Sequence, residues 1–194
     1  MTPIFSIILF VTLGIAVFLI AQLLYNLHRQ KMAEKLLASF EQAAREFDVR
    51  ISKKQVTDHW IIGFDADANK ILFMQQTTTG HDGYLIDLAD ISSATIVKQH
   101  RPFWHRNMKS GVLVETIALQ FDYKDDTPSL QLPFYKMSID PVYYLSDREQ
   151  QVKEWHGLVM AKLEKEVIET MKQGKPVEKP LVLIEQVVEA GMEA

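Results

Sequence analysis

The chain has 194 residues, of which 47% are hydrophobic and 24% are charged, and its formal net charge at pH 7 is −4. It has no cysteine, which excludes a disulfide framework and a cysteine nucleophile. An acidic chain is also not typical of nucleic-acid binders, which usually show a broad basic face.

The N-terminal segment is the most apolar part of the sequence. From Ile4 to Leu24 only Ser6, Thr12 and Gln22 interrupt the apolar run. About 20 such residues in a helix span the roughly 30 Å hydrocarbon core of a bilayer. No basic residue precedes the run, and no small-residue cleavage site follows it, so an uncleaved helix is favoured over a signal peptide. Residues 1–27 are therefore predicted to be a transmembrane anchor.

Basic residues follow the apolar run and do not precede it. Arg29, Lys31 and Lys35 lie just after it, and positive charge favours the cytoplasmic side of a membrane. The sequence thus predicts a single-pass protein of the cell (inner) membrane with its C-terminal domain in the cytoplasm.

Residues 28–48 are predicted to continue as a juxtamembrane helix, because they contain no Pro or Gly and many helix-forming residues. Apolar residues three and four apart form one stripe, which comprises Ala33, Leu37, Phe40, Ala44 and Phe47. The stripe favours a helix packed on its own domain. A short parallel coiled coil, which would make a homodimer, stays open as the alternative, although the stripe barely spans two heptads.

Residues 49–172 are predicted to form one β domain closed by a helix. Apolar runs bounded by turn residues indicate strands near 60–64, 70–79, 84–88, 92–98, 112–124 and 130–135. Alternation in the run 112–124 places Leu113 with Ile117, Leu119 and Phe121 on one face, as in an antiparallel strand with one wet face. The predicted fold class is α+β, with a mainly antiparallel β-barrel or sandwich after the transmembrane helix and a C-terminal α-helix closing it.

The closing helix has a recognisable start and one apolar face. Ser146 and Glu149 have the spacing of a capping box. The apolar face comprises Val152, Trp155, Val159, Leu163 and Val167. Trp155, its largest member, should be buried, and Gly174 and Pro176 should end the helix. Residues 173–194 form a C-terminal tail for which a short helix and a strand both stay open.

This order of elements resembles the pleckstrin-homology-like (PH-like) fold, and the chain is similar to bacterial membrane-anchored proteins with such a domain. The segment "DREQQVKEWHGLV" is similar to the family's terminal helix with its buried Trp. The resemblance covers roughly residues 49–172 and implies a non-catalytic binding module. The family's phosphoinositide signature has basic residues in the first hairpin, where this sequence has "DADANK". Bacterial members often serve as protein-interaction or assembly modules.

A basic stretch, "KQHRPFWHRNMKSG" at residues 98–111, stands out in the acidic chain. It holds four Lys or Arg residues and no acid. Its Pro and Gly suit a long loop between two strands, and such loops commonly carry binding residues. The predicted binding residues are Arg101, Phe103, Trp104, Arg106 and Lys109.

The partner of this stretch is predicted to be a protein. An upright helix from Asn26 to Phe47 would hold the domain about 30 Å from a bilayer, whereas attraction to an anionic surface fades within a Debye length of roughly 8 to 10 Å. Binding of anionic lipid through residues 98–111 stays as the alternative. Nucleic acid is not expected, because one loop is a small footprint.

Catalysis has little support in the sequence. The histidines are scattered, and the step from His100 to His105 fits no common metal-ligand spacing. The run "DADAN" lacks the Gly and the distant Glu of a calcium loop. We therefore expect no enzyme activity, no metal site and no cofactor, with an enzyme whose site is too dispersed to recognise as the remaining hypothesis.

Overall fold

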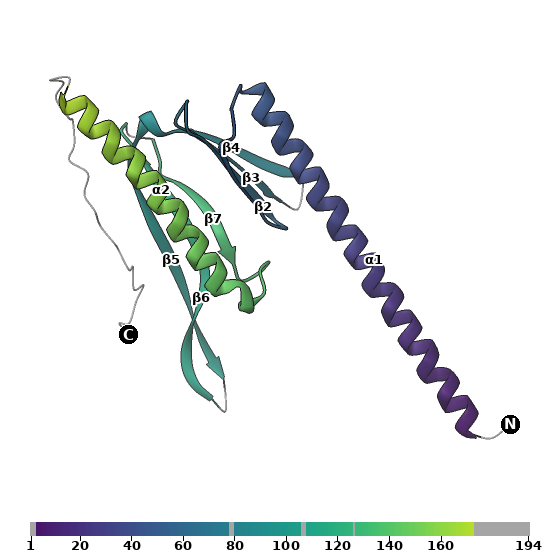
Figure 1. The fold of residues 1–194 in the computed structure, drawn as a ribbon. Helices are drawn as coiled ribbons and strands as arrows, with labels where there is room; N and C mark the ends of the chain where they lie inside the picture. Colours follow the sequence, from purple (N-terminus) through teal and green to yellow (C-terminus); the bar gives the residue numbers. More distant parts are fainter. Residues whose placement is uncertain (1–2, 78–79, 106–107, 126, 173–194) are drawn as a thin grey trace. The chain divides into compact units, whose positions relative to one another are not determined.

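The computed structural model describes residues 3–77, 80–105, 108–125 and 127–172, and the chain divides into two compact units. One unit comprises Met1–Asp65 and Leu72–Tyr84, and the other comprises Ala66–Ile71 and Leu85–Ala194. In chain order the elements are α1 (Pro3–Glu46), β1 (Lys53–Val56), β2 (Trp60–Asp65), β3 (Lys70–Gln76), β4 (His81–Asp87), the 3-10 helix η1 (Leu88–Asp90), β5 (Ile91–His105), β6 (Met108–Tyr123), β7 (Leu130–Lys136), the 3-10 helix η2 (Val142–Tyr144) and α2 (Leu145–Lys172) (Figure 1).

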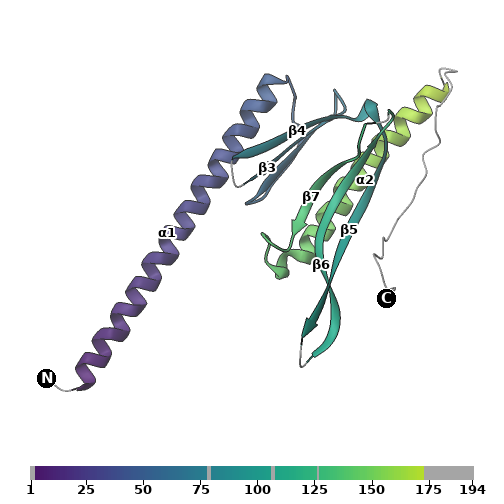
Figure 2. The same cartoon turned by 180° about the vertical axis from the view of Figure 1, so that it is seen from behind.

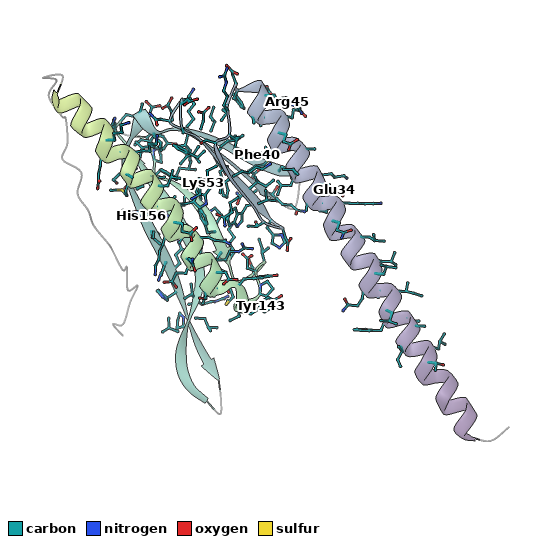
Figure 3. All side chains as sticks on the ribbon, viewed as in Figure 1. Glu34, Phe40, Arg45, Lys53, Tyr143 and His156 are labelled. Carbon is teal, nitrogen blue, oxygen red and sulfur yellow. The ribbon has the colours of Figure 1, made fainter. Side chains whose placement is uncertain are left out.

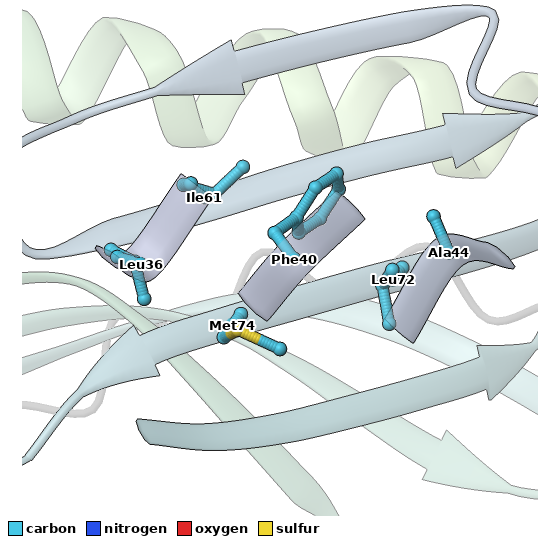
Figure 4. Packing of buried hydrophobic residues seen from close by; sticks show 6 residues of the cluster. All are labelled: Leu36, Phe40, Ala44, Ile61, Leu72 and Met74. Carbon is cyan, nitrogen blue, oxygen red and sulfur yellow. The ribbon is translucent and has the colours of Figure 1, made fainter. Parts of the chain in front are cut away.

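In the first unit the C-terminal part of α1 packs on strands of the four-stranded sheet β1-β2-β3-β4. The cluster at this contact comprises Leu36, Phe40 and Ala44 of α1 with Ile61, Leu72 and Met74 of the sheet (Figure 4). Burying each of the Leu, Ile, Phe and Met side chains contributes about 1.5–3 kcal/mol. Phe40 lies on the strand side of α1 in Figure 3. The predicted packing of this helix on its own domain is confirmed.

The buried face of this helix differs from the predicted stripe at two places. Leu36 is fully buried although it lies outside the stripe, and Leu37 is only partly buried. Phe47 is exposed, because the helix ends at Glu46 and the chain turns there through Asp48, whose φ is 49°.

The second unit is built on the three-stranded antiparallel sheet β5-β6-β7, against which α2 packs. The face of α2 toward the sheet buries Val152, Trp155, Val159, Met160 and Leu163. Trp155 has no exposed surface, as predicted. His156 adds a polar contact, because its Nε2 lies 3.0 Å from the carbonyl oxygen of Ala94 on β5; Figure 3 labels this histidine on α2.

The predicted transmembrane anchor is contradicted. Over the part of the chain that the structure describes, no helix is both long enough and apolar enough to cross a membrane. The prediction of single-pass topology, and of a cell-membrane location with a cytoplasmic domain, is corrected with it.

The predicted fold class, a transmembrane helix followed by a mainly antiparallel β-barrel or sandwich, is also contradicted, because the described strands do not form a closed barrel. The described strands form two open antiparallel sheets, β1-β2-β3-β4 and β5-β6-β7, and no strand pairing joins one sheet to the other. A barrel needs a continuous ladder with no edges, whereas each of these sheets ends in two edge strands. The architecture is α+β with two antiparallel sheets.

The start of α2 also differs from the prediction. The 3-10 helix η2 runs directly into α2, which begins at Leu145, so Ser146 is a helical residue and not an N-cap. Glu149 forms an ion pair with Lys98 of β5. The predicted stop at Gly174 and Pro176, and the tail, lie outside the described residues.

Candidate binding surface

The strands β5 and β6 form a long hairpin that projects beyond the rest of its unit. They span 15 and 16 residues, whereas β7 pairs only with Thr116–Phe121 of β6. Beyond that point the hairpin is a two-stranded ribbon that extends past the ends of β7 and α2 (Figures 1 and 2). We call residues 99–105 and 108–115 the ribbon.

The ribbon corrects the prediction of a long loop at residues 98–111. Pro102 pairs with Val112 and Phe103 pairs with Gly111 within the ladder. Proline is compatible with this position because β5 is an edge strand, with a partner on one side only. Loop-like residues in the sequence thus belong to paired strands.

The register assigns the side chains of the ribbon to two faces, because residues directly opposite each other point to the same side. One face carries the pairs His100 with Val114 and Pro102 with Val112. Val112 is 66% exposed and Pro102 is exposed. Pro102 and Val112 thus give the outer part of this face an apolar surface open to solvent.

The opposite face carries Arg101 opposite Leu113. The Nη1 of Arg101 lies 4.0 Å from Oε1 of Glu115, and the two side chains are 64% and 46% exposed. An ion pair so long and so exposed contributes little free energy. Arg101 therefore keeps most of its charge available to a partner.

A β-bulge separates the ribbon from the sheet. Gln99 pairs with Thr116 and His100 pairs with Val114, so Glu115 is an extra residue in β6. The bulge shifts the alternation by one position and corrects the predicted faces: Leu113 does not continue the face of the buried Ile117.

Charged residues fix the base of the ribbon on α2. The Nζ of Lys98 donates to Oε1 of Glu149 over 2.9 Å, and Lys153 lies 3.0 Å from the same oxygen. The hydrogen bonds from Lys98 and then Lys153 lower the pKa of the Glu149 carboxyl. These contacts tie β5 to the first turns of α2, so the ribbon starts from a fixed base.

Of the five predicted binding residues, only Arg101 has a described side chain, and it is exposed on the ribbon. The side chains of Phe103, Trp104, Arg106 and Lys109 lie outside the described residues, so their role stays a prediction. Sequence reasoning missed Val112 and Leu113, because the run 112–124 predicts a strand that leads out of the basic stretch and the binding residues were sought in that stretch. The uninterrupted run Val-Leu-Val next to Gly111 was the available signal.

The first unit has an open pocket of about 420 Å³. It is lined by Phe40, Glu41, Ala44, Arg45, Ile51, Ser52 and Lys54. Phe40 and Ala44 are already buried in the core cluster, and Lys54 lies 3.9 Å from Glu41. The pocket therefore offers a ligand little free apolar surface.

Asp122 on β6 is the centre of a polar cluster. It accepts hydrogen bonds from Ser93 over 2.7 Å, Ser129 over 2.6 Å and Gln120 over 2.9 Å. Burial raises the pKa of its carboxyl, but these hydrogen bonds outweigh burial and lower the pKa overall. A carboxylate held in this way links neighbouring strands and is poorly placed to accept a proton from a substrate.

No group of three or more His, Cys, Asp or Glu side chains that could hold a metal ion occurs among the residues that the structure describes. Ser39 and His81 form a pair, with Oγ and Nδ1 3.2 Å apart. A Ser–His pair acts as a nucleophile when a third group orients the histidine, and among the described residues the structure gives no such contact for His81. Comparison with known proteins found no family model, no curated protein and no solved structure that matches this chain.

Proposed function

We propose that this chain is a non-catalytic binding module that recognises a protein partner through the β5–β6 ribbon. The observation that carries the proposal is the exposure of apolar and basic side chains together on a projecting ribbon: Val112 is 66% exposed, Leu113 is 38% exposed, and the side chain of Arg101 is 64% exposed. Exposed apolar groups beside an arginine are typical of protein interfaces.

The order of elements supports the resemblance to PH-like domains. Four antiparallel strands are followed by three more and then by a helix that packs on the second sheet with Trp155 buried. We propose a PH-like domain on this basis. Fold alone does not assign a function, so the proposed function rests on the ribbon.

The proposal is tested by capture of partners with the full chain under crosslinking. We expect Val112→Asp to abolish capture, because a charge would be buried at an apolar contact. Val142→Asp is the matched control, since Val142 is 65% exposed, nearly the same fraction as Val112, and lies on η2 outside the ribbon. Loss of capture with both variants, or with neither, would contradict the proposal.

The predicted basic residues are tested by the triple change of Arg101, Arg106 and Lys109 to Glu. Reversal of three charges should abolish capture, because like charges across an interface are costly, while the free energy of unfolding stays within about 1 kcal/mol. Lys35→Glu, an exposed change on α1, is a single-charge control. Unfolding of the triple variant would mean that these charges are paired within the domain.

Anionic lipid is the alternative partner, and vesicle sedimentation distinguishes lipid binding from protein binding. Vesicles of phosphatidylserine and phosphatidylcholine should leave the protein in the supernatant. If the protein sediments with these vesicles, and the triple Glu variant does not, the ribbon binds lipid and not protein.

A further inference from the structure

We infer that the partner binds as an added β-strand, supplied by an extended segment rich in acidic and apolar residues, on the edge of β6 that β7 leaves open. This inference rests on the proposed function and names the kind of partner and its mode of binding. It concerns the β6 side of the ribbon between Gly111 and Glu115.

The open edge follows from the different lengths of the strands. The ladder between β6 and β7 stops at Thr116 opposite Lys136. One further bond, from the amide of Met137 to the carbonyl oxygen of Glu115 over 2.9 Å, closes that end. Among the described residues, no strand continues on this side of β6 from Val114 back to Met108. Backbone donors and acceptors there are available to pair with another chain.

From Gly111 to Val114 the edge lacks charged residues and proline, two of the usual devices that prevent such pairing. Natural edge strands carry inward charges, prolines or covering segments. Here Gly111, Val112, Leu113 and Val114 are consecutive and uncharged, and the proline of the hairpin is on β5, the strand away from this edge. An added strand would place alternate side chains beside Val112 on one face and beside Leu113 on the other, with Arg101 one strand farther away on β5.

The charge of the ribbon indicates the partner's composition. From Lys98 to Val114 the sequence has four basic residues and no acidic residue, within a chain of net charge −4. Among the described basic side chains of this segment, Lys98 is already compensated by Glu149, whereas Arg101 is 64% exposed. A segment with acidic residues among apolar ones complements both the charge and the apolar face.

The test is selection of peptides from a random dodecapeptide display library against the full chain. Enriched peptides should combine Asp or Glu with apolar residues and should lack proline. Their binding should be lost in Val112→Asp and kept in Val142→Asp. On peptide binding, hydrogen exchange should slow at least tenfold at those alternate amides of Val112–Val114 that point away from β5, while exchange at Phe121, already paired with Leu130, should not change.

A backbone-modified peptide separates strand addition from other modes. Methylation of alternate amide nitrogens keeps the side chains but removes donors, so it should weaken binding at least tenfold in one of the two alternate patterns. Binding that depends on Val112 but is indifferent to both methylation patterns would overturn strand addition and leave the proposed function standing. Enrichment of basic peptides, or of none, would also overturn the inference. Binding unaffected by Val112→Asp would count against the ribbon itself.

Discussion

Gly63 is the position at which a single methyl group decides whether α1 can lie against β2. A Cβ built there would lie 2.7 Å from Cζ of Phe40 and 2.8 Å from Cδ1 of Ile51. Both neighbours are in or against the core cluster, so they have little room to move. The missing side chain is therefore part of the packing.

We predict that Gly63→Ala lowers the free energy of unfolding by about 1–3 kcal/mol, the usual effect of overpacking a core. Denaturation in urea measures it. Gly83→Ala is the control, because its Cβ would meet only Cε of Met74 at 3.5 Å, an ordinary contact, and should change stability by less than about 1 kcal/mol. Equal effects of the two changes would mean that α1 does not approach β2 this closely.

Glu149 gives the second prediction at this scale, a dependence on pH. Its pKa is lowered in the folded protein by the hydrogen bonds from Lys98 and Lys153. The stability that it contributes is therefore present above the ordinary carboxyl pKa of about 4.3 and is lost as the pH falls through its lower folded value.

We predict that Glu149→Gln destabilises the domain at pH 7 by no more than about 1 kcal/mol, because the side chains are partly exposed. The difference in the free energy of unfolding between the variant and the wild type should vanish when the pH lies below the pKa of Glu149 in the folded protein. Unfolding curves at pH 7 and at about pH 2.5, in the acid range of this linkage, compare the two proteins. A difference that persists unchanged at the acid pH would show that the ion pairs are not its cause.

At the scale of elements, α2 holds the second unit through its buried face. Trp155→Ala should lower the free energy of unfolding by about 3–5 kcal/mol, the usual effect of truncating a buried aromatic side chain. Thermal and urea unfolding measure the loss. Glu164→Ala, at an exposed position of the same helix, should have little effect. A near-normal melting temperature for the Trp155 variant would contradict the packing of α2 on the sheet.

The sequence was sufficient to predict those helices and strands whose apolar residues recur in a pattern that reflects burial. Strands at six of the seven positions, and the face of α2 around Trp155, follow from apolar runs and spacing. It missed β1, since Lys53–Val56 is polar and largely exposed, and its strand forms by pairing with the buried β2. Such a strand depends on its neighbour and leaves no apolar pattern.

The candidate site was only partly predictable for a related reason. The basic composition marked Arg101 correctly as exposed, but Pro102 and Gly111 were taken as evidence of a loop. Proline breaks a strand only where it removes a needed donor, and an edge strand has one side free. Whether a strand lies at an edge is set by the topology of the whole sheet, which local sequence does not encode.

At the scale of the whole molecule, charge is unevenly distributed. A net charge of −4 coexists with a segment from Lys98 to Val114 that has only basic charge. Long-range attraction to an acidic partner therefore concentrates at the ribbon, while the rest of the chain repels it. Such attraction speeds association and is sensitive to salt.

We predict that capture of the partner weakens as ionic strength rises from 0.1 M to 1 M, because the Debye length falls from about 10 Å to about 3 Å. Association rates should fall more than dissociation rates change. Stopped-flow or surface-binding kinetics at several salt concentrations measure both. An association rate independent of salt would indicate that the apolar face alone recruits the partner.

The bulge at Glu115 has a consequence for how far and in which direction the hairpin reaches. Since the alternation of side chains restarts at the bulge, the faces of the outer hairpin are set independently of the sheet, with a period of two residues. Adding two residues to each outer strand would carry the turn roughly 6–7 Å farther out and leave Pro102 and Val112 on their present side. Adding one residue to each outer strand would instead move every side chain beyond the insertion to the opposite face of the hairpin. Even changes in strand length thus alter how far the hairpin reaches and keep its faces, whereas odd changes also exchange its two faces.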